Sequence, residues 1–166
     1  MTKAEWETGA GFMLEAHGVS HFTATEVCPV GKIWGGATAH APPPDFMLTV
    51  LKLIEGPLKW IRWFQGAAPI GVNSWYRDTD YNEAVGGGTS SMHLTGGAVD
   101  ITKRGWAPER VAFALHYAYP MDTELGIGLY KTFVHIDIRG MIGRRSPARW
   151  SGDGVGEWWK DSGHNS

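Results

Sequence analysis

Residues 126–138 constrain the fold most, because they have the pattern of two short strands joined by a tight turn. In the second strand, expected over 133–138, successive side chains point to opposite faces. Val134, Ile136 and Ile138 are apolar and β-branched, so we predict that their shared face packs on the core. His135 and Asp137 would then lie on the opposite face, which we expect to be open and suited to line a polar site.

The remaining pattern predicts helices packed on a small antiparallel sheet, which is the α+β class. From Asp45 onward, apolar residues recur at helical spacing and predict the main helix, which Gly56 and Pro57 should kink or split in two. The capping box from Thr23 to Glu26 predicts a short helix. The other expected elements are one helical turn over 80–85, a helix over 108–117, and strands over 69–75 and 98–102.

Composition excludes several classes of protein. A chain of 166 residues that is 43% hydrophobic can bury one core, so we expect a single compact domain. Lys and Arg number 15 against 17 Asp and Glu, so the chain lacks the broad basic field of a nucleic-acid-binding protein. The single cysteine, Cys28, cannot form an internal disulfide, and we expect it in the core.

Membrane insertion and export are not expected from the sequence. No run approaches the roughly 18 apolar residues of a membrane span. The first 18 residues include three glutamates and lack a continuous apolar core, so they do not resemble a signal peptide. We therefore expect synthesis in the cytoplasm without a signal peptide.

Three side chains form a candidate metal site. His93 ends a predicted loop, Asp100 lies in the following strand, and Gly96 with Gly97 permits a sharp turn between them. With His135 they make two imidazoles and one carboxylate, which suit zinc and leave a fourth position for water. The spacing of His93 and Asp100 is weak by itself, since hydrogen-bonded structural roles would explain the same pair.

Three segments resemble a family of zinc peptidases. Ser91-Met-His-Leu-Thr-Gly-Gly-Ala-Val-Asp100 fits the S-x-H-x-x-G-x-A-x-D motif of the zinc D-alanyl-D-alanine carboxypeptidases, which are grouped with lysostaphin-type enzymes and the Sonic hedgehog signalling domain. Residues 73–87 are similar to the family's "SGYRS…YN…AVGG" segment, and residues 133–137 to its "FVHVD" strand. The likeness covers roughly residues 20–140, in the expected order.

The resemblance implies a domain organisation and an α+β fold like that of hedgehog and the D,D-peptidases. Residues 1–19 would be a partly helical lead-in, 20–140 the zinc peptidase domain and 141–166 a C-terminal tail that wraps the surface or frays.

The resemblance also implies roles for individual residues. Zn²⁺ would be held by His93, Asp100 and His135. Arg77 would grip a substrate carboxylate or the charge developing on the attacked carbonyl, and its alternative role is a surface ion pair with Asp78 or Asp80. Ser91 would either contact substrate or fix its loop.

The implied activity is hydrolysis of peptide bonds in bacterial peptidoglycan stem peptides, of the D,D-carboxypeptidase or L-alanyl-D-glutamate endopeptidase type. A phage endolysin is the expected setting, with action at the cell wall after release or as part of a virion or tail assembly. The alternative is a weak or inactive family member that serves as a virion structural or wall-binding protein.

The general base departs from the family pattern. Some relatives carry an acid where this chain has Thr132, and others a histidine where it has Phe133. Asp137 is the best remaining candidate for the catalytic base, ahead of Glu124 and His116. Asp137 could instead accept the outer N–H of His135 and orient that ring.

Overall fold

The computed structural model describes residues 1–43, 45–152 and 154–159. The chain forms two compact units, each built from two segments. The first unit comprises Met1–Glu55 and Ser74–Val99, and the second comprises Gly56–Asn73 and Asp100–Ser166. Within the described residues, no helix combines the length and the apolar character needed to cross a membrane.

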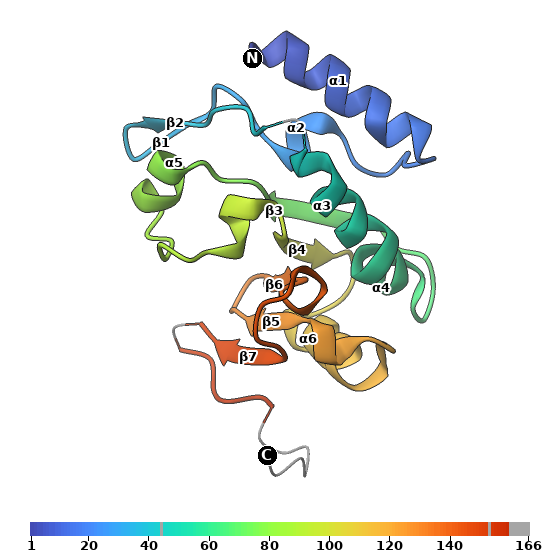
Figure 1. Cartoon of the computed structure of the whole chain (residues 1–166). Helices are drawn as coiled ribbons and strands as arrows, with labels where there is room; N and C mark the ends of the chain where they lie inside the picture. The colour runs from blue at the N-terminus through green and yellow to red at the C-terminus, as the bar shows by residue number, and fades with distance from the viewer. Residues whose placement is uncertain (44, 153, 160–166) are drawn as a thin grey trace. The chain divides into compact units, whose positions relative to one another are not determined.

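Helices dominate the first unit (Figure 1). They are α1 (Lys3–Ala16), α2 (Ala24–Val27), α3 (Phe46–Leu53), α5 (Thr79–Ala84) and the 3-10 turn η2 (Met92–Thr95). The capping box predicted at Thr23 is present and starts α2. Trp6 of α1 donates its indole N–H to the carbonyl oxygens of Ala24 and Cys28, at 3.1 and 3.2 Å. The lead-in therefore forms a full helix that packs on α2.

A two-stranded antiparallel sheet completes the first unit. Its strands are β1 (Ile33–Trp34) and β2 (Ala37–Thr38). The chain reverses between them through Gly35 and Gly36, which both have positive φ. Such a turn favours glycine because other residues are strained in this conformation.

The predicted kink in the main helix is confirmed. After α3 the chain passes through the kinked segment η1 (Ile54–Leu58) and continues as α4 (Lys59–Trp63). Gly56 leaves helical geometry, with φ −90° and ψ −110°, immediately before Pro57. Proline lacks an N–H and clashes with the preceding turn, so the helix cannot continue straight through it.

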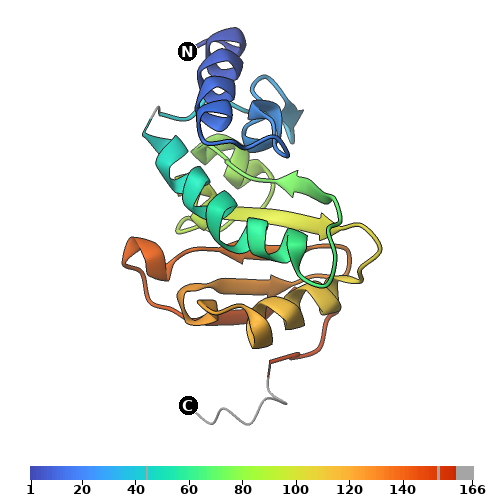
Figure 2. The same ribbon diagram turned by 90° about the vertical axis from the view of Figure 1, so that its right-hand side faces the viewer.

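The second unit is built on a five-stranded sheet of order β3-β4-β6-β5-β7. Its strands are β3 (Ile70–Ser74), β4 (Ala98–Lys103), β5 (Gly126–Leu129), β6 (Val134–Asp137) and β7 (Ala148–Ser151). The terminal residues of β3 and β4, Ser74 and Ala98–Val99, belong to the first unit. The helix α6 (Pro108–Ala118) packs against β5 and β6 (Figure 2). Short 3-10 turns, η3 (Asp122–Glu124) and η4 (Gly140–Ile142), precede β5 and follow β6.

The α+β class is confirmed, with one difference in the sheet. The predicted antiparallel hairpin is present, and Gly128 pairs with His135 across it. However, β7 joins β5 in parallel, which makes the larger sheet mixed. This strand comes from the tail for which we expected wrapping or fraying; of that tail, 153 and 160–166 lie outside the described residues.

Both faces of β6 are buried. Val134, Ile136 and Ile138 have no exposed surface, as predicted for the core face. The opposite face was expected to be open, but His135 is only 8% exposed and Asp137 is fully buried. The cause is β7, whose Trp150 ring lies 5.0 Å from the His135 ring, centroid to centroid.

Candidate metal centre

His93 is held in the first unit with one ring nitrogen already engaged. It lies in η2, where the Ser91 hydroxyl accepts the His93 backbone N–H at 3.3 Å and Gly96 ends the turn with φ 69°. The ring is buried, and its Nδ1 donates to the carbonyl oxygen of Trp75. In a neutral imidazole the proton on Nδ1 leaves a lone pair on Nε2. Nε2 is therefore the nitrogen that can bind a metal.

Asp100 and His135 face each other within the second unit. Asp100 in β4 is 5% exposed, and its Oδ1 lies 2.9 Å from Nδ1 of His135 in β6. On the other side of the ring, Nε2 lies 3.2 Å from Oδ2 of Asp137. The ring thus presents Nδ1 toward Asp100 and is oriented through Nε2, which is the arrangement of a metal-binding histidine with a supporting carboxylate.

Arg139 holds Asp137 in place. Its backbone N–H and Nε donate to Oδ1 at 3.0 and 2.8 Å, and its Nη2 donates to Oδ2 at 2.6 Å. These are charge-assisted bonds of the strong, forked kind. Together with the bond from His135, they engage both oxygens of a carboxylate that has no solvent exposure.

The charges around His135 oppose the effect of burial. Burial alone lowers the pKa of His135, but the hydrogen bonds and negative charges of Asp100 and Asp137 outweigh it and raise that pKa. Burial raises the pKa of Asp137, but its bonds to Arg139 and His135 hold that pKa well below its usual range. Asp137 therefore stays ionised at neutral pH and is a poor proton acceptor.

The three predicted ligands could form a metal site. His93, Asp100 and His135 are all buried, each offers one ligand atom, and these atoms lie within 4.8 Å of one another. Two imidazole nitrogens and one carboxylate oxygen are a donor set that zinc accepts.

The family model for peptidase M15 matches residues 20–137. The chain belongs to the peptidase M15 family. The match covers well over half of the chain and includes all three candidate ligands. Membership indicates a zinc-dependent metallopeptidase, in agreement with the donor set. No curated protein matches the chain.

Arg77 and Ser91, predicted to contact substrate, lie in the same unit as His93. The backbone N–H of Arg77 donates to the His93 carbonyl at 3.2 Å, and its Nε donates to the Ser74 hydroxyl at 2.8 Å. Asp78, considered as an ion-pair partner for Arg77, caps α5 and accepts from the backbone N–H of His40. Ser91 fixes the turn that carries His93, while its contact with substrate stays a prediction.

The two weaker candidates for the base have other neighbours. His116 of α6 lies 3.4 Å from Oδ2 of Asp122 and 3.3 Å from Nε of Arg149. Glu124 lies against Gly140, where an added Cβ would come within 2.2 Å of Oε2. The Arg149 guanidinium also donates to the Leu125 carbonyl at 2.7 Å, so this network ties β7 to the residue before β5.

Sequence reasoning missed Trp150 and Arg139, although β5 carries a signal for both. Gly126 and Gly128 stand opposite Asp137 and His135 in the hairpin and therefore share their face. A Cβ on Gly128 would lie 2.4 Å from the Trp150 ring, and one on Gly126 would lie 2.6 Å from Nε of Arg139. Two glycines at alternate positions of a strand mark a face that large side chains cross.

Proposed function

We propose that the chain is a zinc-dependent hydrolase of peptide bonds in bacterial peptidoglycan stem peptides, of the D,D-carboxypeptidase or L-alanyl-D-glutamate endopeptidase type. Residues 20–140 would form the peptidase domain, acting at the cell wall after release from the cytoplasm or as part of a virion or tail assembly. Membership of the peptidase M15 family supports the activity, and the motif in residues 91–100 supports the substrate class.

One observation carries the assignment of His93, Asp100 and His135 as zinc ligands. Each histidine has one nitrogen bonded to an oxygen acceptor, Trp75 O for His93 and Asp137 Oδ2 for His135. Such partners fix the tautomer and the ring orientation of metal-binding histidines. When bound, zinc would lower the pKa of a water molecule and polarise the substrate carbonyl.

Arg77 would bind the negative charge of the substrate. The backbone N–H of Arg77 donates to the His93 carbonyl oxygen. Arg77 and the candidate ligand His93 therefore belong to one local structure. A guanidinium offers five donors in a fixed fork and suits a peptide carboxylate or the oxyanion that develops during attack. Ser91 would support this region by holding the η2 turn.

Asp137 would orient His135 rather than accept a proton from water. Both of its oxygens are engaged by Arg139 and His135, it is fully buried, and its pKa is held well below the ordinary value. A general base needs an accessible lone pair and a pKa nearer the working pH. Of the two roles that the sequence leaves open, the contacts favour orientation.

The test combines metal analysis with product analysis. Purified protein is expected to hold about one zinc per chain, and mass spectrometry of treated muropeptides should identify the cleaved bond. His93→Ala should abolish both zinc binding and cleavage, whereas His21→Ala, at an exposed position, should change neither. Absence of zinc would refute the proposal. Zinc without cleavage would favour the inactive alternative, a virion structural or wall-binding protein.

A further inference from the structure

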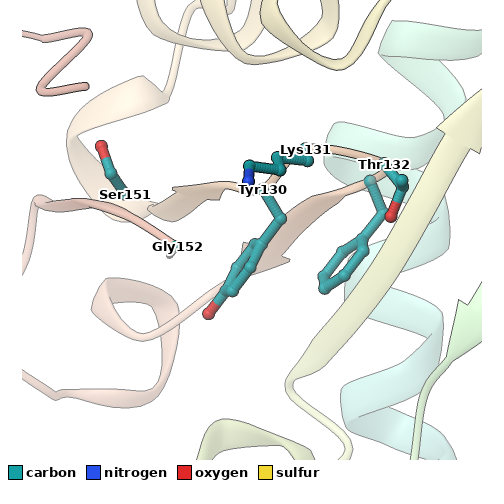
Figure 3. Close-up of a pocket in the computed structure, with 6 residues that line it drawn as sticks. Tyr130, Lys131, Thr132, Ser151 and Gly152 are labelled. Atoms are coloured by element: carbon teal, nitrogen blue, oxygen red, sulfur yellow. The ribbon is translucent and has the colours of Figure 1, made fainter. Parts of the chain in front are cut away.

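A pocket of about 420 Å³ opens at the end of the β5–β6 hairpin (Figure 3). One side is the hairpin turn and the other is the chain leaving β7. Its lining residues are Tyr130, Lys131, Thr132, Phe133, Ser151 and Gly152. Ser151 and Gly152 lie beyond the region that matches the family, so this chain's own C-terminal segment forms part of the pocket.

Aromatic rings connect the pocket to the candidate metal centre. Tyr130 and Phe133 stack with centroids 4.4 Å apart and an interplanar angle of 11°. The Trp150 indole N–H donates to the Tyr130 hydroxyl at 3.1 Å, and its ring packs against His135. Phe133 also precedes His135 by two residues and shares its strand face. Aromatic contacts therefore run from the pocket to His135.

The one charged group that lines the pocket is a cation. Among its six lining residues, Lys131 is the one charged side chain, and it is exposed. Figure 3 shows its amine end directed toward the side formed by Ser151 and Gly152. Thr132 adds a hydroxyl group at the rim. Flat apolar rings beside one ammonium group suit an aliphatic chain that ends in a carboxylate.

We propose that this pocket is a substrate subsite that takes a carboxylate-bearing aliphatic side chain of the peptide, with the Lys131 ammonium binding the carboxylate. The proposal rests on the proposed peptidase function and adds a specificity determinant to it. A lysine ammonium is a single point charge without the fork of a guanidinium, and we assign it one carboxylate as its partner.

The experiment compares two synthetic stem peptides that differ only in whether that side-chain carboxylate is free or amidated. For Lys131→Met, KM for the acidic peptide should rise by up to about fivefold, the upper end of the range for an exposed ion pair. Its kcat, and both constants for the amidated peptide, should stay unchanged. Lys131→Glu should raise KM for the acidic peptide further, and Lys52→Met, at an exposed position in α3, serves as the control.

Two results would support the subsite. Lys131→Met should no longer discriminate between the two peptides, and in the wild type the discrimination should weaken at high salt. Equal effects on both peptides, or none, would overturn it. If the wild type cleaves neither peptide, the peptidase proposal fails separately. Calorimetric binding of the same pair to zinc-loaded protein then decides: tighter binding of the acidic peptide that depends on Lys131 supports the subsite, and equal binding refutes it.

Discussion

Asp137→Asn separates an orienting carboxylate from a general base. The substitution replaces one carboxylate oxygen by an NH2 group and leaves the shape nearly unchanged. Oδ1 accepts two N–H groups from Arg139, and Oδ2 accepts one from Arg139 and one from His135. Whichever position the new NH2 group takes, it meets groups that are themselves donors.

The expected loss follows from the tautomer of His135. An NH2 group at the Oδ2 position would donate to Nε2 and so favour the proton on Nδ1, the nitrogen that faces Asp100. Zinc would have to displace that proton. We expect zinc affinity to fall about 10- to 100-fold, the usual effect of losing such a partner. That loss is about 1.4–2.7 kcal/mol.

The metal-free protein should lose stability as well. Arg139 is half-buried and loses at least one charge-assisted bond to a fully buried partner. Bonds of this kind contribute about 1.5–3 kcal/mol each. We therefore expect the free energy of unfolding without metal to fall by about 3 kcal/mol, measured by urea denaturation.

Competition with a chromophoric chelator measures the zinc affinity. Asp122→Asn is the matched control, because Asp122 also lies against a histidine and an arginine, His116 and Arg149, but in the network that ties down β7. It should lower stability while zinc affinity stays the same. Zinc affinity unchanged in Asp137→Asn, together with a turnover loss of about 10²–10⁴, would refute the orienting role and identify a base.

Three further substitutions or reactions test the packing. Lys103→Met removes a buried ammonium that donates to the carbonyls of Ile61 and Phe64, both at 2.8 Å. Urea denaturation should show that the free energy of unfolding falls by about 3 kcal/mol. An unchanged free energy of unfolding would contradict a stabilising role for these hydrogen bonds. Gly128→Ala should displace Trp150 and cost about 2 kcal/mol, whereas Gly9→Ala, with open space around it in α1, should be neutral or stabilising in the same assay. Burial, with a smaller effect from Asp78, raises the pKa of Cys28 to about 12, so at pH 8 only about one thiol in 10⁴ is ionised. A thiol reagent should therefore react far more slowly with the native protein than with the protein in urea. Equal rates would show that this thiol is accessible.

Sequence reasoning predicted the local structure well, because local side-chain patterns determine it. The capping box at Thr23 starts α2, and the pair Gly56–Pro57 breaks the main helix as expected. The start of α2 and the break in the main helix each depend on residues that are close in the sequence. The alternation in 133–138 likewise assigned Val134, Ile136 and Ile138 to the core.

The candidate ligands could be identified for a different reason. His93, Asp100 and His135 stand in motifs that resemble a known family, and the roles of such residues follow from residue type and spacing. The hydrogen-bond partners of the two rings could only partly be inferred. Asp137 is visible two residues from His135, but the Trp75 carbonyl is a backbone group, which no motif reveals.

The sequence by itself therefore determined the short helix α2, the break in the main helix, the hairpin, the core face of β6 and the identity of the candidate ligands, because these depend on short-range patterns. Only the tertiary structure decided that the other face of β6 is closed. That outcome requires β7 to pair with β5 and Trp150 to cross Gly128 and reach His135. Strand pairing across some twenty residues is chosen by the burial and hydrogen bonding of the whole sheet, and no local pattern encodes it.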